Sequence, residues 1–199
     1  MWESTLFLFV SDHGEELYDH GGWLHHRTLF EELMHVPMIA HFPGQEEGRR
    51  VAGSTSLIDV APTILDYLGL ATDGLQGISL LEALQREPEG PRVVANRFNQ
   101  MIHYGPDVDR FGHVNLAVTE GSWKGIWNLD LDSFELYDLS SDPTETQDLA
   151  AQEPELTARL LDFGKAWLKG VGEPLVSGGE DQEIDPEVLE RLKALGYAK

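Results

Sequence analysis

The apolar positions of the first ninety residues fall into short runs separated by polar turns. Residues 5–10 (TLFLFV) form a continuous apolar run, which predicts a strand buried on both faces, as in a parallel sheet. Residues 38–42 predict a second strand, and residues 28–34 have helical spacing. A further helix is predicted over residues 58–68, with Asp59 as its cap. This alternation of strands and helices predicts an α/β arrangement.

The pattern changes after a break at residues 88–91. Short β-prone segments joined by turns then predict an antiparallel sheet. These segments are residues 93–98, 113–120, 122–128 and 134–139. Residues 155–169 predict a helix that places Leu156, Leu160, Phe163 and Trp167 on one face. A Gly-rich acidic linker and a last helix starting at Asp185-Pro186 are expected to follow.

The charge balance excludes several classes of partner. The 199 residues include 35 acidic and 14 basic side chains, and the formal net charge is −21. Such a chain repels phosphate backbones and anionic lipids, so we expect no nucleic-acid and no membrane partner. The absence of cysteine excludes a disulfide, a thiolate metal site and a cysteine nucleophile. The first apolar run is too short for a signal peptide or a membrane span, and the compartment stays open.

The first candidate for chemistry is the pair Asp12 and His13, directly after the predicted strand 5–10. In open α/β sheets, ligands bind at the carboxyl ends of strands, and a carboxylate beside an imidazole can ligate a divalent cation. The alternative is that Ser11 and Asp12 cap a turn and that His13 is a hydrogen-bonded loop residue. A strand this close to the first residue also suggests that part of the fold lies upstream.

The second candidate is a cluster of histidines. Five of the eight histidines lie within the first 35 residues: His13, His20, His25, His26 and His35. Histidine is the side chain best suited to proton transfer near neutral pH, so we expect at least one of them to be functional. The alternative is a His-rich surface loop. His35, next to a proline turn, is expected to be structural, and Glu31 and Glu32 are expected to be solvated or to buttress the fold.

Several ordered motifs resemble the sulfatase family of the alkaline-phosphatase superfamily. They are SDHGEE (11–16), DHG (19–21), TLFEE (28–32), HVPMI (35–39), LIDVAPTIL (57–65), GISL (77–80) and ELYDL (135–139). The resemblance covers nearly the whole chain. It implies the C-terminal part of an alkaline-phosphatase-like α/β sandwich, with a small C-terminal antiparallel-sheet-plus-helix subdomain.

The resemblance also implies roles for three residues. Asp12 and His13 match the family positions that bind one divalent cation, for which Ca²⁺ is favoured and Mn²⁺ or Zn²⁺ are alternatives. His25 matches the position of a cationic or acidic side chain near the leaving oxygen, where it is expected to be catalytic. His20 is expected to shape the loop. The implied substrate is a sulfated carbohydrate or another small sulfate ester.

The chain departs from the family pattern at the nucleophile. The family nucleophile is a formylglycine made within a C/S-x-P-x-R motif, and this chain has no such motif. We therefore expect the formylglycine upstream of this chain, and we expect residues 1–90 to be the C-terminal portion of the catalytic domain. Residues 91–170 are expected to be the sheet-and-helix subdomain, and residues 171–199 a linker with the terminal helix.

Three functions stay open on the sequence. The first is a fragment of a metal-dependent sulfuric ester hydrolase, whose N-terminal half carries the nucleophile. The second is a fragment of a related phosphonate or phosphodiester hydrolase. The third is a non-catalytic remnant or the subunit of a split enzyme, with an N-terminal half or partner chain. In each case we predict that this chain alone is inactive.

Overall fold

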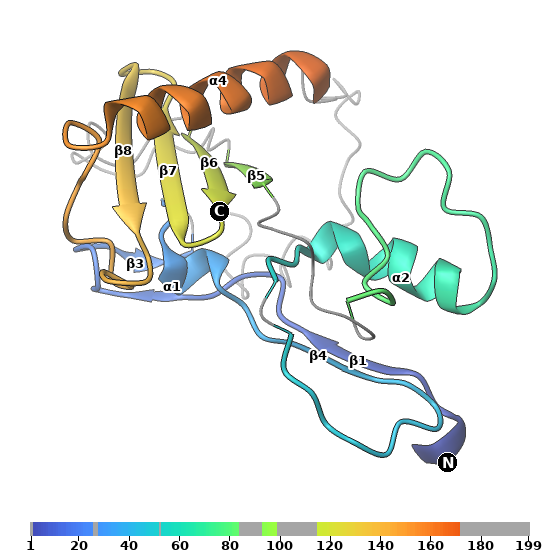
Figure 1. Cartoon of the computed structure of the whole chain (residues 1–199). Coiled ribbons are helices and arrows are strands. Elements are labelled where there is room, and N and C mark those ends of the chain that lie inside the picture. Colours follow the sequence, from blue (N-terminus) through green and yellow to red (C-terminus); the bar gives the residue numbers. More distant parts are fainter. Residues whose placement is uncertain (1, 26–27, 52, 84–92, 99–114, 172–199) are drawn as a thin grey trace, which may run out of the picture. The chain divides into compact units, whose positions relative to one another are not determined.

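A computed structural model of the chain describes all residues except 1, 26–27, 52, 84–92, 99–114 and 172–199 (Figure 1). The chain divides into two compact units, Met1–Trp167 and Leu168–Lys199, and the second is described only as far as Val171. The expected terminal helix and most of the linker lie outside the described residues. The expected division at residues 90 and 170 stays a prediction.

The described elements alternate between short strands and helices, followed by a meander and one long helix. They are η1 (Trp2–Ser4), β1 (Phe7–Val10), β2 (Glu16–Leu17), β3 (Trp23–Leu24), α1 (Glu31–Met34), β4 (Met38–His41), η2 (Leu57–Asp59), α2 (Val60–Tyr67), β5 (Val93–Phe98), β6 (Asn115–Glu120), β7 (Trp123–Asn128), β8 (Ser133–Asp138) and α4 (Pro154–Val171).

The strand predicted over residues 5–10 forms, but it is not buried in this chain. β1 pairs antiparallel with β4, with Phe7 opposite His41 and Val10 opposite Met38, and the two form a two-stranded sheet. Phe9 is 50% exposed, and Ile39 on β4 is also exposed. The prediction of a strand buried in a parallel sheet is therefore wrong for the described residues, because β1 has one strand partner there and two open faces.

The helix predicted over residues 58–68 begins as η2 and continues as α2. Asp59 is the N-cap residue of α2, but its side chain makes no capping hydrogen bond to that helix. The side chain instead completes a capping box with Ser56, the N-cap of η2. The buried Asp59 carboxylate also accepts the backbone N–H of Ile78 at 2.9 Å. A Cβ on Gly77 would lie 2.0 Å from the Ile58 carbonyl oxygen, so only glycine fits there. Asp59 and Gly77 thus tie the loop of residues 77–80 to the helix.

The antiparallel sheet predicted for the second half is present. β5, β6, β7 and β8 pair in sequence order, and the residues at the centre of β6 and β7 are buried. α4 covers one face of this sheet: a Cβ on Gly164 would lie 2.8 Å from the Leu116 side chain. Leu160 is buried as predicted, whereas Phe163 is exposed because Gly164 takes the position that faces the sheet.

The opposite face of the sheet packs against the segment around α1. Leu29 forms one buried cluster with Ala117, Ile126 and Tyr137, and Phe30 and Met34 pack against that cluster. Successive strand residues point to opposite faces, so Leu116 contacts α4 while Ala117 contacts Leu29. The meander and the segment that follows the His-rich loop therefore share one core.

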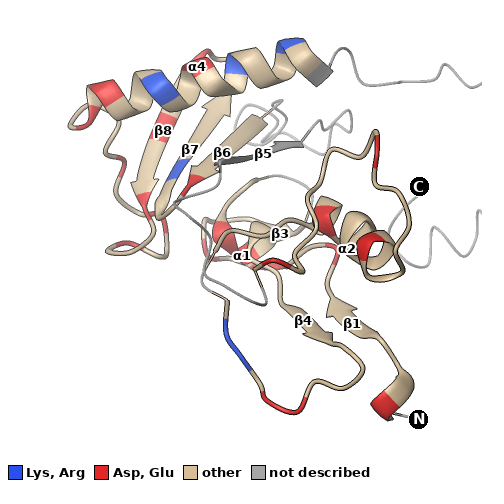
Figure 2. Ribbon diagram, turned by 45° about the vertical axis from the view of Figure 1, so that its right-hand side comes forward, with Lys and Arg blue, Asp and Glu red and all other residues tan. Residues whose placement is uncertain are grey.

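Acidic residues occur on described elements from η1 to α4 rather than in one tail (Figure 2), although β1, β3, β4, β5 and β7 carry none. The basic side chains of the described residues include a series along α4 (Figure 2). Within the described ranges, no helix is both long and apolar enough to cross a membrane.

Candidate functional site

The loop that follows β1 is fixed by a close backbone contact at Gly14. Its N–H donates to the Leu33 carbonyl at 2.9 Å, and the next N–H, of Glu15, donates to the Glu32 carbonyl at 3.0 Å. A Cβ at residue 14 would lie 1.9 Å from the Glu32 carbonyl oxygen, so any other residue would push the loop away from α1. The glycine of the SDHG motif thus sets the position of the residues on either side of it.

The buried carboxylate of Glu16 stabilises the turn between β2 and β3. Glu16 has no exposed surface, and its Oε1 accepts the backbone N–H groups of His20 at 3.3 Å and Gly22 at 2.6 Å. β2 and β3 pair in the register Glu16 opposite Leu24. The next residues outward from this pair are Glu15 and His25. The pairing of these two short strands therefore places His25 next to Glu15, at the start of the loop.

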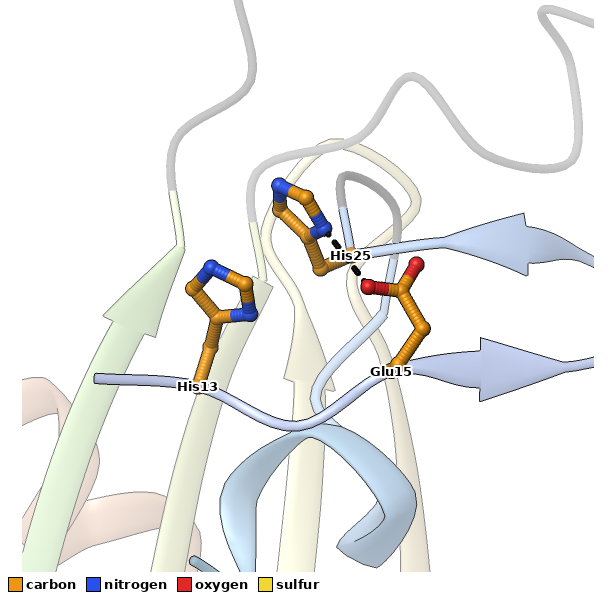
Figure 3. Close-up of side chains that lie close together, drawn as sticks. All are labelled: His13, Glu15 and His25. Carbon is orange, nitrogen blue, oxygen red and sulfur yellow. Dashed lines mark hydrogen bonds and ion pairs between the residues drawn. The ribbon is translucent and has the colours of Figure 1, made fainter. Parts of the chain in front are cut away.

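Three side chains converge at this point (Figure 3). The rings of His13 and His25 stack with their centroids 4.0 Å apart, and the Nδ1 of His25 donates to the Glu15 carboxylate at 3.1 Å. Each residue offers one ligand atom, and these atoms lie within 4.8 Å of one another. We call His13, Glu15 and His25 the imidazole cluster. Among the residues that the structure describes, it is the one group of three such side chains close enough to hold a metal ion.

Asp12 lies beside the imidazole cluster, with its side chain 83% exposed. Its Oδ1 accepts the His13 backbone N–H at 3.1 Å and lies 3.8 Å from the Nε2 of the same residue. The Nδ1 of His13 donates to the Gly14 carbonyl at 2.7 Å, which leaves the lone pair on Nε2. Asp12 and His13 lie side by side, as neighbours in the sequence must, and their role as metal ligands stays a prediction. A shallow hollow lined by Val10 and Leu57 borders Asp12.

His20 lies apart from the imidazole cluster and holds the loop. Its ring stacks on Phe30 at 3.7 Å, and its Nδ1 is 2.7 Å from a Glu32 carboxylate oxygen. Burial lowers the pKa of His20, but the hydrogen bond and charge of Glu32, with a smaller effect of Glu145, outweigh it and raise the pKa above its usual value. These contacts agree with the predicted role of His20 in shaping the loop, and they show that Glu32 buttresses it.

A second charged group, which sequence reasoning missed, joins α1 to the meander. Lys124 on β7 is 1% exposed, and its Nζ lies 2.8 Å from Glu31 Oε1 and 2.9 Å from Glu145 Oε1. Glu145 is buried, and its second oxygen accepts the Glu31 backbone N–H at 2.6 Å. We call these three residues the buried charge triad. The signal available in the sequence was indirect: Glu31 lies in the TLFEE motif, and Glu145 follows the ELYDL motif by six residues.

Stability should depend on pH through His20. The pKa of His20 is raised in the folded chain, so its protonated form stabilises the fold. That contribution is present in full below the unfolded pKa of about 6.5 and is lost as pH rises through the folded value. Thermal unfolding should therefore show that His20→Asn lowers the melting temperature more at pH 5.5 than at pH 8.5.

The matched control is His35→Asn, because His35 also faces a glutamate, Glu31 at 3.5 Å, but has an exposed side chain. Its effect on the melting temperature should be small at both pH values. Equal effects of His20→Asn at the two pH values would show that the contacts of His20 do not depend on its charge.

Comparisons with known proteins agree on one family. A family model described as N-sulphoglucosamine sulphohydrolase, C-terminal, matches residues 19–162. Arylsulfatase K of Bos taurus is 30% identical over 164 residues, which cover 79% of this chain and 30% of that protein. Choline-sulfatase of Rhizobium meliloti is 33% identical over 158 residues, which cover 75% of this chain and 28% of that protein. The chain thus spans about a third of the length of these relatives.

Solved structures show the same fold. An enzyme solved in complex with its substrate, D-glucosamine-2-N,6-O-disulfate, superposes with a TM-score of 0.67 at 24% identity, over 85% of this chain and 35% of that one. The phosphonate monoester hydrolase of Agrobacterium radiobacter superposes with a TM-score of 0.63 at 30% identity, over 84% of this chain and 35% of that one. Each similarity covers most of this chain and only part of the larger protein.

Proposed function

Because this chain belongs to the sulfatase family and has the fold of its C-terminal part, we propose that it supplies one half of the active site of a metal-dependent sulfuric ester hydrolase. The observation that carries the proposal is the position of Asp12 and His13, which adjoin each other after β1 with His25 stacked against His13. The nucleophile, a formylglycine in this family, would come from an N-terminal half that this chain does not contain.

Asp12 and His13 are the proposed ligands of the divalent cation. The donor set fits: a carboxylate oxygen and the Nε2 lone pair lie 3.8 Å apart and can approach one ion, while Gly14 fixes the ring through Nδ1. When bound, the cation polarises the sulfate oxygens. The resemblance favours Ca²⁺ and leaves Mn²⁺ and Zn²⁺ as alternatives. Two ligands make a weak site, so the remaining ligands would belong to the N-terminal half.

His25 is the proposed catalytic residue of this half. Its Nδ1 donates to Glu15, and stacking on His13 limits rotation of the ring. A ring held in this way can present its other nitrogen to the leaving oxygen of a sulfate ester and donate a proton to it. This assignment rests on the family position that His25 matches.

The surface around β1 supports the need for an N-terminal half. Phe7, Phe9 and Val10 on β1 and Ile39 on β4 are all exposed, as are Leu57 and Ile58. An apolar strand pair with open edges is a site for adding further strands. We propose that the occupant is the N-terminal part of a sulfatase catalytic domain, because the relatives have about two thirds of their length outside the region that this chain matches.

The proposed substrate is a sulfated carbohydrate or another small sulfate ester, in line with what the names of several relatives state of those proteins. A second candidate is a phosphonate monoester, favoured by the 30% identity to a phosphonate monoester hydrolase. The third possibility, a non-catalytic module, differs from both because it predicts no turnover with any N-terminal half.

The chain alone should not hydrolyse p-nitrophenyl sulfate above the buffer rate, because it lacks the nucleophile and the remaining metal ligands. Co-expression with the N-terminal half of a related sulfatase should restore metal-dependent release of p-nitrophenol. The same assay with a p-nitrophenyl phosphonate ester distinguishes the two hydrolase candidates. Metal-dependent turnover by the purified 199-residue chain would contradict the division of the active site proposed here.

A further inference from the structure

The imidazole cluster has a donor set that differs from that of the proposed cation site. His13, Glu15 and His25 offer two ring nitrogens and one carboxylate oxygen. Imidazole nitrogen is preferred by Zn²⁺ and other transition metals, whereas Ca²⁺ prefers oxygen ligands, so two rings favour Zn²⁺ more strongly than the single ring of the proposed cation site does. Two histidines and a glutamate, with one position left open, form a donor set found in zinc enzymes.

The three ligands are brought together before any ion arrives. Gly14 fixes the backbone between His13 and Glu15 through its contact with Glu32, and the β2–β3 register returns His25 to Glu15. The buried Glu16 carboxylate holds this turn through two backbone N–H groups. Binding of an ion would therefore require little further ordering of the backbone. All three ligands lie within residues 13–25.

Access and charge also favour an ion at this point. The side chains of His13, Glu15 and His25 are 35%, 42% and 21% exposed, so an ion can reach the cluster from solvent at His13 and Glu15, while the Nε2 of His25 is buried. The Glu15 carboxylate offsets part of the ion's charge, and Asp12 Oδ1, 3.8 Å from His13 Nε2, lies near enough to take the open position.

We infer that His13, Glu15 and His25 form a binding site for a transition-metal ion of the Zn²⁺ type, which this chain can fill without an N-terminal half. The inference goes beyond the proposed function, because it adds Glu15 and His25 as ligands and concerns the isolated chain. An ion in this site would take His13, a proposed ligand of the resident cation, and would hold His25 as a ligand, so that His25 could not donate a proton. Zn²⁺ bound there is therefore expected to compete both with the resident cation and with the proposed role of His25.

The test is a calorimetric titration of the full 199-residue chain with ZnSO₄, paired with Co²⁺ absorption spectra that report the ligand geometry. We expect one Zn²⁺ per chain with a tetrahedral Co²⁺ spectrum, and we expect millimolar Ca²⁺ not to displace it. Glu15→Gln keeps an oxygen that accepts the His25 N–H but loses the charge, so the fold is preserved. It should weaken Zn²⁺ binding about tenfold or more, and His25→Ala should do the same.

The matched control is His35→Ala, which removes another histidine that faces a glutamate but has no third ligand. It should leave the Zn²⁺ affinity unchanged. Equal Zn²⁺ affinity of the parent chain, Glu15→Gln and His25→Ala, with circular dichroism spectra that show all three folded, would overturn the inference. Displacement by equimolar Ca²⁺ would also overturn it. Because no turnover is measured, failure here leaves the proposed hydrolase function untouched, and loss of that function leaves this result intact.

Discussion

Replacing Lys124 with methionine should lower the free energy of unfolding by about 3–5 kcal/mol, because it removes the cation of the buried charge triad. The ammonium of Lys124 contacts Glu31 and Glu145 at 2.8 and 2.9 Å in a region where Lys124 has almost no exposed surface. Burial already raises the pKa of Glu145, and the charge of Lys124 opposes that effect. Without Lys124, the Glu145 carboxylate stays buried beside Glu31 and loses the cation that contacts both carboxylates. Urea unfolding followed by tryptophan fluorescence measures the change.

Lys165→Met is the matched control for this substitution. Lys165 is an exposed lysine of α4 that lies 5.7 Å from the Trp127 ring centroid, so its loss should cost about 1 kcal/mol or less. The double variant Lys124→Met with Glu145→Gln should recover part of the stability, because it removes one unpaired charge. If Lys124→Met costs no more than Lys165→Met, the buried charge triad does not contribute to stability in the way described here.

In the enzyme assembled with an N-terminal half, His25→Ala should lower kcat by about 10²–10⁴-fold, the usual range for loss of a general acid. The resident divalent cation should stay bound, because its proposed ligands Asp12 and His13 are unchanged. Asp12→Ala should lower both the metal content and the rate. Steady-state kinetics and elemental analysis of the same protein samples, in buffer without added zinc, separate the two effects.

The exposed His35→Ala provides the baseline for both variants and should leave the rate and the metal content unchanged. An Asp12→Ala enzyme with normal metal content and rate would show that the ligand assignment is wrong. A His25→Ala enzyme that lost its metal along with its rate would instead identify His25 as a ligand of the resident ion.

The local patterns of the sequence predicted the type and bounds of the helices and strands better than they predicted the burial of those elements. The β-prone segments became β5 to β8, and helical periodicity placed α4 within two residues at each end. The apolar run of residues 5–10 predicted a strand correctly but its burial wrongly. A continuous apolar run indicates a strand suited to burial on both faces. In the described part of this chain β1 pairs only with β4, so its side chains stay exposed.

The sequence named three residues of the candidate site, and their roles stay predictions. Asp12 and His13 were identified as neighbours directly after a predicted strand, and His25 was identified by its resemblance to a family position. Glu15 was not, because the sequence has 35 acidic residues and only the β2–β3 register places this one beside His25. The contacts of Lys124 span 93 residues to Glu31 and 21 to Glu145, and no local pattern reports pairings of that range.

The buried charge triad also has a consequence for how the molecule opens. It joins β7 to the backbone of α1, and α1 in turn holds Gly14 and Glu15 through the carbonyls of Leu33 and Glu32. Local opening of the meander would therefore break the ion pairs that hold α1. Amide hydrogens in the meander and in the loop of residues 11–25 are thus expected to exchange together, as one cooperative unit. The loop that carries Asp12, His13 and His25 is therefore expected to lose its order when the meander unfolds.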